Sequence, residues 1–262
     1  MSAAADLSAP VHLLADLREL KLPAFAEHYS RVADEAQRSR RDYADYLADL
    51  AHLEVSGRLE RRIARRIKDA RFPILKTLDE FDFGAQPDLD KDTILELATG
   101  DFIDERANVV LLGGVGTGKT HLAIALGIAA CQQDRRVRFI TAAELTTDLV
   151  EAKAADRLSR RLEYFARFDL IAIDEVGYVP FDRVGADLLF SFVTRVYERR
   201  SLIVTTNLPF GRWSEVFHDA TAAAAVIDRI VHHATVLQTG GDSYRLQDAK
   251  RRRGGRKEVA PS

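Results

Sequence analysis

The chain has 262 residues, of which 47% are hydrophobic and 30% charged, and its formal net charge is −2. This length is sufficient for one large or two smaller domains with a buried core. No apolar run reaches the ~18 residues of a membrane span, and no basic segment precedes an apolar core at the start, so we expect neither a membrane-spanning segment nor a signal peptide. Cys131 is the only cysteine, which excludes an internal disulfide and a cysteine-rich metal site and favours a cytoplasmic location.

Residues 1–72 are predicted to form a small, wholly helical N-terminal domain. A serine and a proline near the start are helix start signals, and leucines recur after them at helical spacing. Residues 22–36 and 43–55 continue with similar amphipathic patterns. The prolines and glycine in the first part of residues 73–107 indicate a linker that leads into a second domain.

The last part of the helical region is strongly basic. The stretch GRLERRIARRIKDARFP contains seven basic residues and only two acidic ones, and five of its arginines share one helical stripe. Such a stripe suits the phosphate backbone of DNA, although a solvated helix face is the usual fate of a charge run. No base-reading motif accompanies it, so we expect binding to depend little on DNA sequence. The candidate DNA-binding residues are Arg58, Arg61, Arg62, Arg65, Arg66, Lys68 and Arg71.

From residue 108 onward, short apolar runs alternate with helical patterns. The predicted strands are 108–112, 137–141, 170–174, 202–207 and 236–238. The predicted helices are 121–132, 143–153, 157–165, 186–199 and 222–233. This alternation predicts an α/β fold in which helices cover both faces of a parallel sheet. We assign the pattern to a domain at 108–247, and we expect the polar, basic residues 248–262 to form a disordered tail.

A glycine-rich loop follows the first of these strands. Gly113-x4-Gly118-Lys119-Thr120 matches the P-loop pattern and lies between a predicted strand and a predicted helix. Backbone amides and the helix N-terminus would face the phosphates, Lys119 would reach the β- and γ-phosphates, and Thr120 would bind Mg²⁺. The alternative is a glycine-rich turn before a surface helix. The candidate nucleotide-binding residues are Gly113, Gly114, Val115, Gly116, Thr117, Gly118, Lys119, Thr120 and His121.

Two acidic residues end the apolar strand in FDLIAIDEVGYVP. The carboxyl ends of parallel strands are where such sheets bind ligands. Asp174 would hold Mg²⁺ through water, and Glu175 would polarise the attacking water. A solvated acidic pair at a strand end is the alternative. The adjacent glutamate favours an NTPase that attacks with water over a simple GTPase or a small-molecule kinase.

A third polar position follows the apolar strand in RRSLIVTTNLPF. Asn207 could hydrogen-bond the γ-phosphate or the attacking water and report whether that phosphate is present. A Thr-Asn turn closed by Pro209 is the alternative. Its place after a P-loop strand and an acidic strand favours the sensor role.

Together these motifs resemble the AAA+ ATPases, and specifically the IstB-like proteins of the IstB/DnaC-like branch. Nearly the whole chain takes part, through KTLDEFDF, GGVGTGKTHLAIALG, LIAIDEVGYVP, NLPF with the following Trp and Phe, and DRIVHHA with SYR. The resemblance implies an AAA+ P-loop core behind a helical N-terminal domain, with ATP and Mg²⁺ as ligands. It implies Mg-dependent ATP hydrolysis by a homo-oligomer that assembles on duplex DNA. The oligomer would help the transposase of the same insertion sequence select and engage its target.

The resemblance also suggests roles for single residues. Asn207 corresponds to the family's sensor, and Arg229 to the arginine that reaches a neighbouring subunit's ATP. An Arg229–Asp228 surface pair is the alternative. Other candidate fingers are Arg195, Arg199 and Arg200, whereas the role of Arg245 stays open. No helical lid is evident after SYRL, which puts a lid-borne sensor arginine in doubt.

Two other functions fit parts of the pattern. A loader of the replicative helicase would have the same ATPase core and would prefer single-stranded DNA. A P-loop small-molecule kinase would need neither the basic stripe nor the Asn207 sensor. His232 and His233 are adjacent and cannot share one helix face as a zinc pair would, so we assign them no metal. We expect Trp213 in the core.

Overall fold

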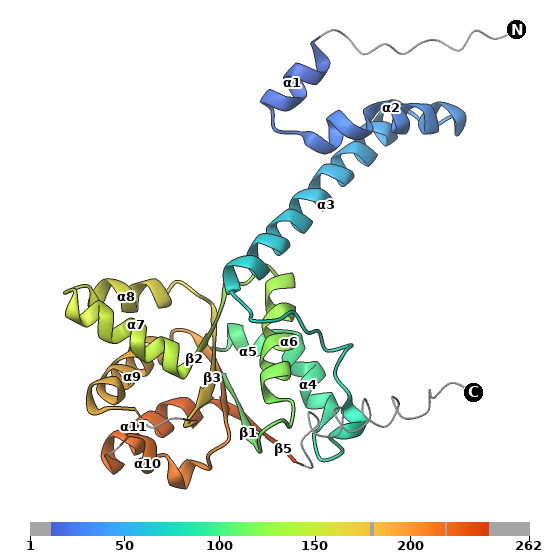
Figure 1. The fold of residues 1–262 in the computed structure, drawn as a ribbon. Helices are drawn as coiled ribbons and strands as arrows, with labels where there is room; N and C mark the ends of the chain where they lie inside the picture. The colour runs from blue at the N-terminus through green and yellow to red at the C-terminus, as the bar shows by residue number, and fades with distance from the viewer. Residues whose placement is uncertain (1–11, 179–180, 218, 241–262) are drawn as a thin grey trace, which may run out of the picture. The chain divides into compact units, whose positions relative to one another are not determined.

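The computed structural model describes residues 12–178, 181–217 and 219–240 (Figure 1). Arg245 and the predicted tail at 248–262 lie outside these described residues. The chain divides into two compact units, Met1–Arg65 and Arg66–Ser262, and each is described by itself. The division falls inside a helix that continues without interruption through the basic segment, and therefore precedes the domain boundary drawn at residue 72.

The described part of the first unit is helical, as the amphipathic patterns predict. Leu17, Val32 and Leu50 are among its buried residues. The second helix begins at a proline, whose missing N–H is not needed in the first turn of a helix. The helices are α1 (Leu13–Glu19), α2 (Pro23–Arg38) and the N-terminal part of α3 (Tyr43–Ala70).

The second unit is built on a five-stranded sheet with the order β2-β3-β4-β1-β5, and all of its strand pairs are parallel. All five strands lie where the sequence predicts them, with ends that differ by up to two residues. Thr141 pairs with Asp174, and Leu112 with Thr206, so the carboxyl ends of β1 to β4 meet at one edge. The strands are β1 (Asn108–Gly113), β2 (Val137–Thr141), β3 (Leu170–Val176), β4 (Ser201–Thr206) and β5 (Ala234–Thr239).

Helices cover both faces of the sheet, which confirms the predicted α/β architecture. Successive residues of β1 alternate between two hydrophobic clusters, because neighbouring side chains of a strand point to opposite faces. Val110 packs in the cluster that includes α7, α9 and α11, whereas Val109 and Leu111 pack in the cluster that includes α4 and α6. The helices are α4 (Lys91–Ala98), α5 (Asp101–Asp104), α6 (Lys119–Gln132), α7 (Ala142–Ala154), α8 (Leu158–Phe165), α9 (Arg183–Val196), α10 (Ser214–Phe217) and α11 (Ala220–Val231).

The segment 73–107 contains more structure than a linker. It holds the 3-10 turn η1 (Phe83–Ala85) together with α4 and α5, and Ile94 in α4 is fully buried. The sequence did not show these elements because they are short, and their apolar faces are defined only by contact with α6. Trp213 is 1% exposed, which confirms the core position expected for it, and Cys131 is fully buried as well. No helix among the described residues has the length and apolar character needed to cross a bilayer.

Candidate active site

The P-loop connects β1 to α6. Gly118 caps α6 with a φ of +91°, and a Cβ atom there would lie 2.8 Å from the Phe81 ring. Glycine is therefore required at this position for both its backbone conformation and its lack of a side chain. Lys119 begins the helix and its Nζ donates to the carbonyl oxygens of Gly113 (2.8 Å) and Gly114 (2.6 Å). The lysine thus lies over the loop whose amides would hold a phosphate.

The acidic residues of β3 meet the P-loop at the carboxyl edge of the sheet. Asp174 is 4% exposed, and Thr120 Oγ1 donates to both of its carboxylate oxygens at 3.1 and 3.0 Å. A hydroxyl and a carboxylate this close together are the oxygen ligands that suit Mg²⁺, so the residues fit the ion. Glu175 is exposed, with a φ of +62° that is rare for a non-glycine residue and often marks a functional site.

Thr205 is a site residue that the sequence did not identify. Its hydroxyl donates to Asp174 Oδ1 and accepts a hydrogen bond from the backbone N–H of Glu175 at 2.9 Å. One buried side chain on β4 therefore holds both acidic residues. Asn207, the predicted sensor, follows the end of β4 and is exposed. The TTN sequence marked the right strand end, but only the hydrogen bonds of the folded sheet show that the first threonine contacts the acidic residues of β3.

A cavity of about 310 Å³ adjoins the P-loop. Its walls are the loop and the start of α6 on one side, and residues between Ile74 and Gln86 on the other. His121 was predicted to contact nucleotide; its Nε2 lies 2.8 Å from the Thr77 carbonyl oxygen, and burial lowers its pKa. The covering segment was not predicted, because its position over the loop depends on long-range packing.

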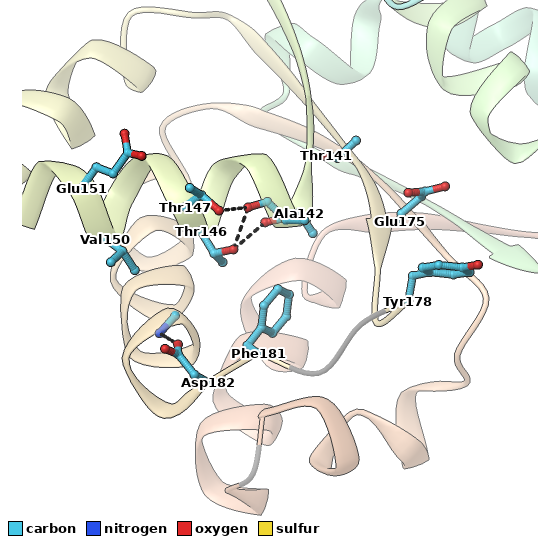
Figure 2. Close-up of a pocket in the computed structure, with 12 residues that line it drawn as sticks. Thr141, Ala142, Thr146, Thr147, Val150, Glu151, Glu175, Tyr178, Phe181 and Asp182 are labelled. Atoms are coloured by element: carbon cyan, nitrogen blue, oxygen red, sulfur yellow. Dashed lines mark hydrogen bonds between the residues drawn. The ribbon is translucent and has the colours of Figure 1, made fainter.

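A second cavity of about 370 Å³ opens beside Glu175 (Figure 2). Figure 2 shows Glu175 and Tyr178 on one side and the α7 residue Val150 on the other. The hydroxyls of Thr146 and Thr147, which line it, donate to backbone carbonyls of their own helix. The cavity is therefore mainly apolar next to the exposed carboxylate of Glu175.

Arg229, the predicted finger, lies on α11 and lines neither of the two cavities described above. Its Nη1 donates to the Ala225 carbonyl at 2.8 Å, and its guanidinium lies 5.1 Å from the centre of the Phe190 ring. Among the competing arginines, Arg195 pairs with Glu163 and Arg200 donates to the Ala166 carbonyl at 2.7 Å. Arg229 therefore contacts its own helix and the neighbouring helix α9.

The basic segment is partly neutralised within its own unit. Glu54 is 3% exposed and pairs with Arg58 at 2.8 Å and with Arg61 at 3.6 Å. Burial raises the pKa of Glu54, but the hydrogen bonds from Arg58 and the Ala24 amide, together with the charges of Arg58 and Arg61, outweigh burial and hold the pKa below its usual value. In the second unit, Arg66 pairs with Asp134 at 3.1 Å. The remaining candidates are exposed: Arg62, Arg65, Lys68 and Arg71.

His232 and His233 do not lie within a helix, contrary to the sequence prediction. Helix α11 ends at Val231, so His232 and His233 lie in a turn, and the rule against neighbours on one helix face does not apply. Their ring centres are 4.2 Å apart, and one ligand atom of each lies within 4.8 Å of a Glu198 carboxylate oxygen.

Comparison with known proteins identifies the family of the chain. The family model for IstB-like ATP binding proteins matches residues 15–252. The chain is 40% identical over 235 residues to a protein named as an ATP-binding protein of insertion sequence IS21 from Pseudomonas aeruginosa, covering 90% of this chain and 89% of that one. It is 39% identical over 236 residues to the corresponding protein of IS232 from Bacillus thuringiensis subsp. berliner, covering 90% and 94%.

Solved structures show the same fold at low sequence identity. AMPPCP-bound DnaA from Aquifex aeolicus has a TM-score of 0.54 and 18% identity, covering 73% of this chain and 59% of that chain. DnaI has a TM-score of 0.51 and 17% identity, covering 64% and 89%. These neighbours share the AAA+ P-loop fold, which confirms the predicted fold class. With the family model matching most of its length, the chain belongs to the IstB-like ATP binding proteins.

Proposed function

We propose that the chain binds ATP with Mg²⁺ and hydrolyses it. The observation that carries this proposal is the contact of Thr120 with Asp174 beside Glu175. Lys119 would bind the β- and γ-phosphates, and Thr120 and Asp174 would hold Mg²⁺. Glu175, exposed at the same edge, would polarise the attacking water. All four residues belong to the second unit, so nucleotide binding through them needs no residue of the first unit.

The energy of hydrolysis would serve DNA transposition. The relatives are named for insertion sequences, which makes a transposase of the same element the expected partner. Duplex DNA is the expected nucleic-acid partner. Its phosphates would be contacted by the exposed basic residues Arg62, Arg65, Lys68 and Arg71. Contacts to phosphate carry no sequence information, so binding would be largely independent of sequence.

We further propose a homo-oligomer in which Arg229 reaches the ATP of a neighbouring subunit. The arginine lies outside the site formed by its own P-loop and acidic residues, and a cation supplied by another subunit can stabilise charge on the γ-phosphate. In the described structure it donates to one backbone carbonyl, lies over one aromatic ring and is near Tyr197, contacts that it can exchange for a phosphate. Asn207 would complete the site as the sensor.

A helicase loader is the second candidate function. It would use the same ATPase core, and it differs from the first in its preference for single strands. Electron microscopy with ATP and either duplex or single-stranded DNA separates the two. An ordered assembly on duplex supports the transposition helper, whereas assembly on single strands alone supports the loader.

Two substitutions test the chemistry. Glu175→Gln is expected to keep Mg–ATP binding and nearly stop phosphate release, because Lys119, Thr120 and Asp174 remain. Lys119→Ala is expected to lose tight nucleotide binding. Both are measured by nucleotide titration and phosphate release, and turnover at the wild-type rate in Glu175→Gln would remove Glu175 from its role.

A further inference from the structure

Two buried side chains near the nucleotide site lack hydrogen-bond partners. Among the described residues, the buried side-chain nitrogen and oxygen atoms without a partner belong to Gln86, Arg135 and Arg138. Native proteins leave few such groups, because each costs about 1–3 kcal/mol of desolvation that no hydrogen bond returns. Gln86 and Arg138 each line a cavity, so a ligand could supply the missing partners.

Gln86 is held firmly against the P-loop cavity. The residue is 4% exposed, and neither Oε1 nor Nε2 has a partner. Its backbone N–H donates to the Phe83 carbonyl at 3.0 Å, and its own carbonyl accepts from the Leu89 N–H at 3.1 Å. The turn that follows η1 therefore fixes the backbone from which the side chain extends. The same cavity contains the phosphate-binding loop and apolar walls from Ile74, Phe81 and Ile124.

We propose that the carboxamide of Gln86 recognises the adenine base of the bound nucleotide through its 6-amino and N7 edge. This inference rests on the ATP binding proposed above. Oε1 would accept from the 6-amino group while Nε2 donates to N7, which is how amide side chains pair with adenine in two hydrogen bonds. Guanine presents two acceptors on that edge, so Oε1 would face an acceptor in either orientation of the amide, O6 in one and N7 in the other. Gln86 therefore selects adenine over guanine.

The test is a comparison of ATP and GTP affinity by calorimetric titration. Wild type is expected to prefer ATP, and Gln86→Met to lose about tenfold or more of that preference, from the value of a two-bond base contact. Gln86→Met is also expected to unfold at the same or a higher temperature without nucleotide, because it removes two unpaired polar atoms. Gln86→Glu keeps the shape and the acceptor but loses the donor, and is expected to weaken ATP binding.

Gln132→Met makes the same chemical change at an exposed position of α6 and is expected to leave the ATP preference unchanged. An unaltered ATP-to-GTP ratio in both Gln86 variants, or equal losses of both affinities, would overturn the base contact. A wild-type protein that binds neither nucleotide would instead overturn the proposed function itself.

Arg138 carries a second inference from a separate cavity. It lies on β2, the edge strand, and is 6% exposed with no partner for Nε or Nη1. Burial lowers the pKa of Arg138, and the nearby charge of Arg71 lowers it further. Arginine nevertheless stays protonated in proteins, so the strand holds a buried positive charge. It forms no ion pair among the described residues, and the nearby carboxylate of Glu144 offsets only part of the effect of burial on its pKa. Such a charge is costly unless something pairs with it.

The cavity beside Arg138 has a volume of about 570 Å³ and also contains Arg71 and Arg161. Four acidic groups line it as well, namely Glu175 at the edge of the sheet and three that are already engaged. Asp148 accepts from Arg161 Nε at 2.8 Å, Glu144 accepts from the Thr141 N–H at 3.0 Å, and Asp174 accepts from two threonines. A neighbouring cavity of about 530 Å³ shares Arg71 and adds more cations. These are Arg66, Lys68, Arg136 and Arg167.

We infer that Arg138 and Arg71 form a phosphate site, filled by a phosphodiester of bound DNA. Guanidinium groups are suited to phosphate because their donors match its oxygens in pairs. The inference rests on the proposed DNA binding, but it places a phosphate contact on the sheet edge of the second unit. Free inorganic phosphate presents the same chemistry and is the other source that the experiment must separate.

The test replaces Arg138 with Met, which removes the charge and keeps much of the volume. Without ligand, the variant is expected to unfold at a higher temperature than wild type, because an unpaired buried charge is lost. Affinity for a short duplex is expected to fall about tenfold, and the salt slope by about one unit. Arg160→Met, at an exposed position of α8, is the control, and we expect it not to raise the unfolding temperature.

Inorganic phosphate, compared with chloride at equal ionic strength, separates the sources. One outcome is that phosphate stabilises the wild type but not Arg138→Met, while the variant still binds duplex as the wild type does. That outcome would keep the phosphate site but overturn DNA as the source of the phosphate. A lower unfolding temperature for Arg138→Met without ligand would overturn the site, since it would show that Arg138 is satisfied within the fold. Loss of duplex binding in wild type would overturn the proposed function instead.

Discussion

Replacing Thr205 with Val tests whether the link between the two acidic residues matters for catalysis. Valine has nearly the same shape, so the substitution removes the hydroxyl and little packing. The hydroxyl makes a hydrogen bond to the charged Asp174 and accepts one from the Glu175 amide. Hydrogen bonds to charged groups contribute about 1.5–3 kcal/mol and neutral ones about 1 kcal/mol. We therefore expect the free energy of unfolding to fall by about 2–4 kcal/mol.

The catalytic effect is expected to exceed what this loss of stability explains. Asp174 and the Glu175 backbone would move relative to the P-loop, and small misplacements of catalytic groups cost up to about a hundredfold in rate. We expect the phosphate-release rate at saturating Mg–ATP to fall by about tenfold to a hundredfold in Thr205→Val. Urea unfolding and nucleotide titration on the same samples would show that the protein is folded and still binds ATP.

Thr206→Val is the matched control. Its hydroxyl donates to the Leu208 carbonyl at 3.2 Å and accepts from the Leu208 N–H at 3.1 Å, without touching either acidic residue. This variant is expected to be destabilised but to release phosphate at close to the wild-type rate. Equal rates for Thr205→Val and wild type would refute the reasoning, as would equal rate losses for the two variants.

Three further predictions follow from the site. Burial lowers the pKa of His121 below its ordinary 6.5, so the unfolded chain binds this proton more readily and the free energy of unfolding should decline as pH falls through about 6.5. His121→Gln should flatten that decline when unfolding is measured from pH 7.5 to 5.5. An unchanged slope would assign the decline to other groups. Gly118→Ala should weaken ATP binding at least tenfold by titration, because a Cβ would strain the backbone and press on the Phe81 ring; wild-type affinity would contradict this. Arg229→Ala should bind ATP but lose oligomer-stimulated hydrolysis, and mixing it with Lys119→Ala should restore some activity; no recovery in demonstrated mixed assemblies would count against a finger supplied by a neighbour.

The P-loop, the acidic strand end and the parallel sheet could be predicted from the sequence because each depends on local pattern. A strand followed by Gly113–Thr120 and a helix specifies its own backbone, whatever lies around it. Apolar runs alternating with helical patterns likewise specify strand and helix in order, and all five strands were found. Asp174 and Glu175 were evident because a charged pair ends an otherwise apolar strand.

Only the tertiary structure decided which distant groups meet. Thr205 bonds Asp174 because β3 and β4 are neighbours, an order that the linear sequence does not state. Glu54 neutralises part of the basic stripe because it is buried where the stripe begins, whereas charge counting treats all seven bases alike. Gln86 and Arg138 look like ordinary polar residues in the sequence. Their lack of partners is a property of packing, since burial and hydrogen bonding are set by the whole surrounding shell and not by neighbours in the chain.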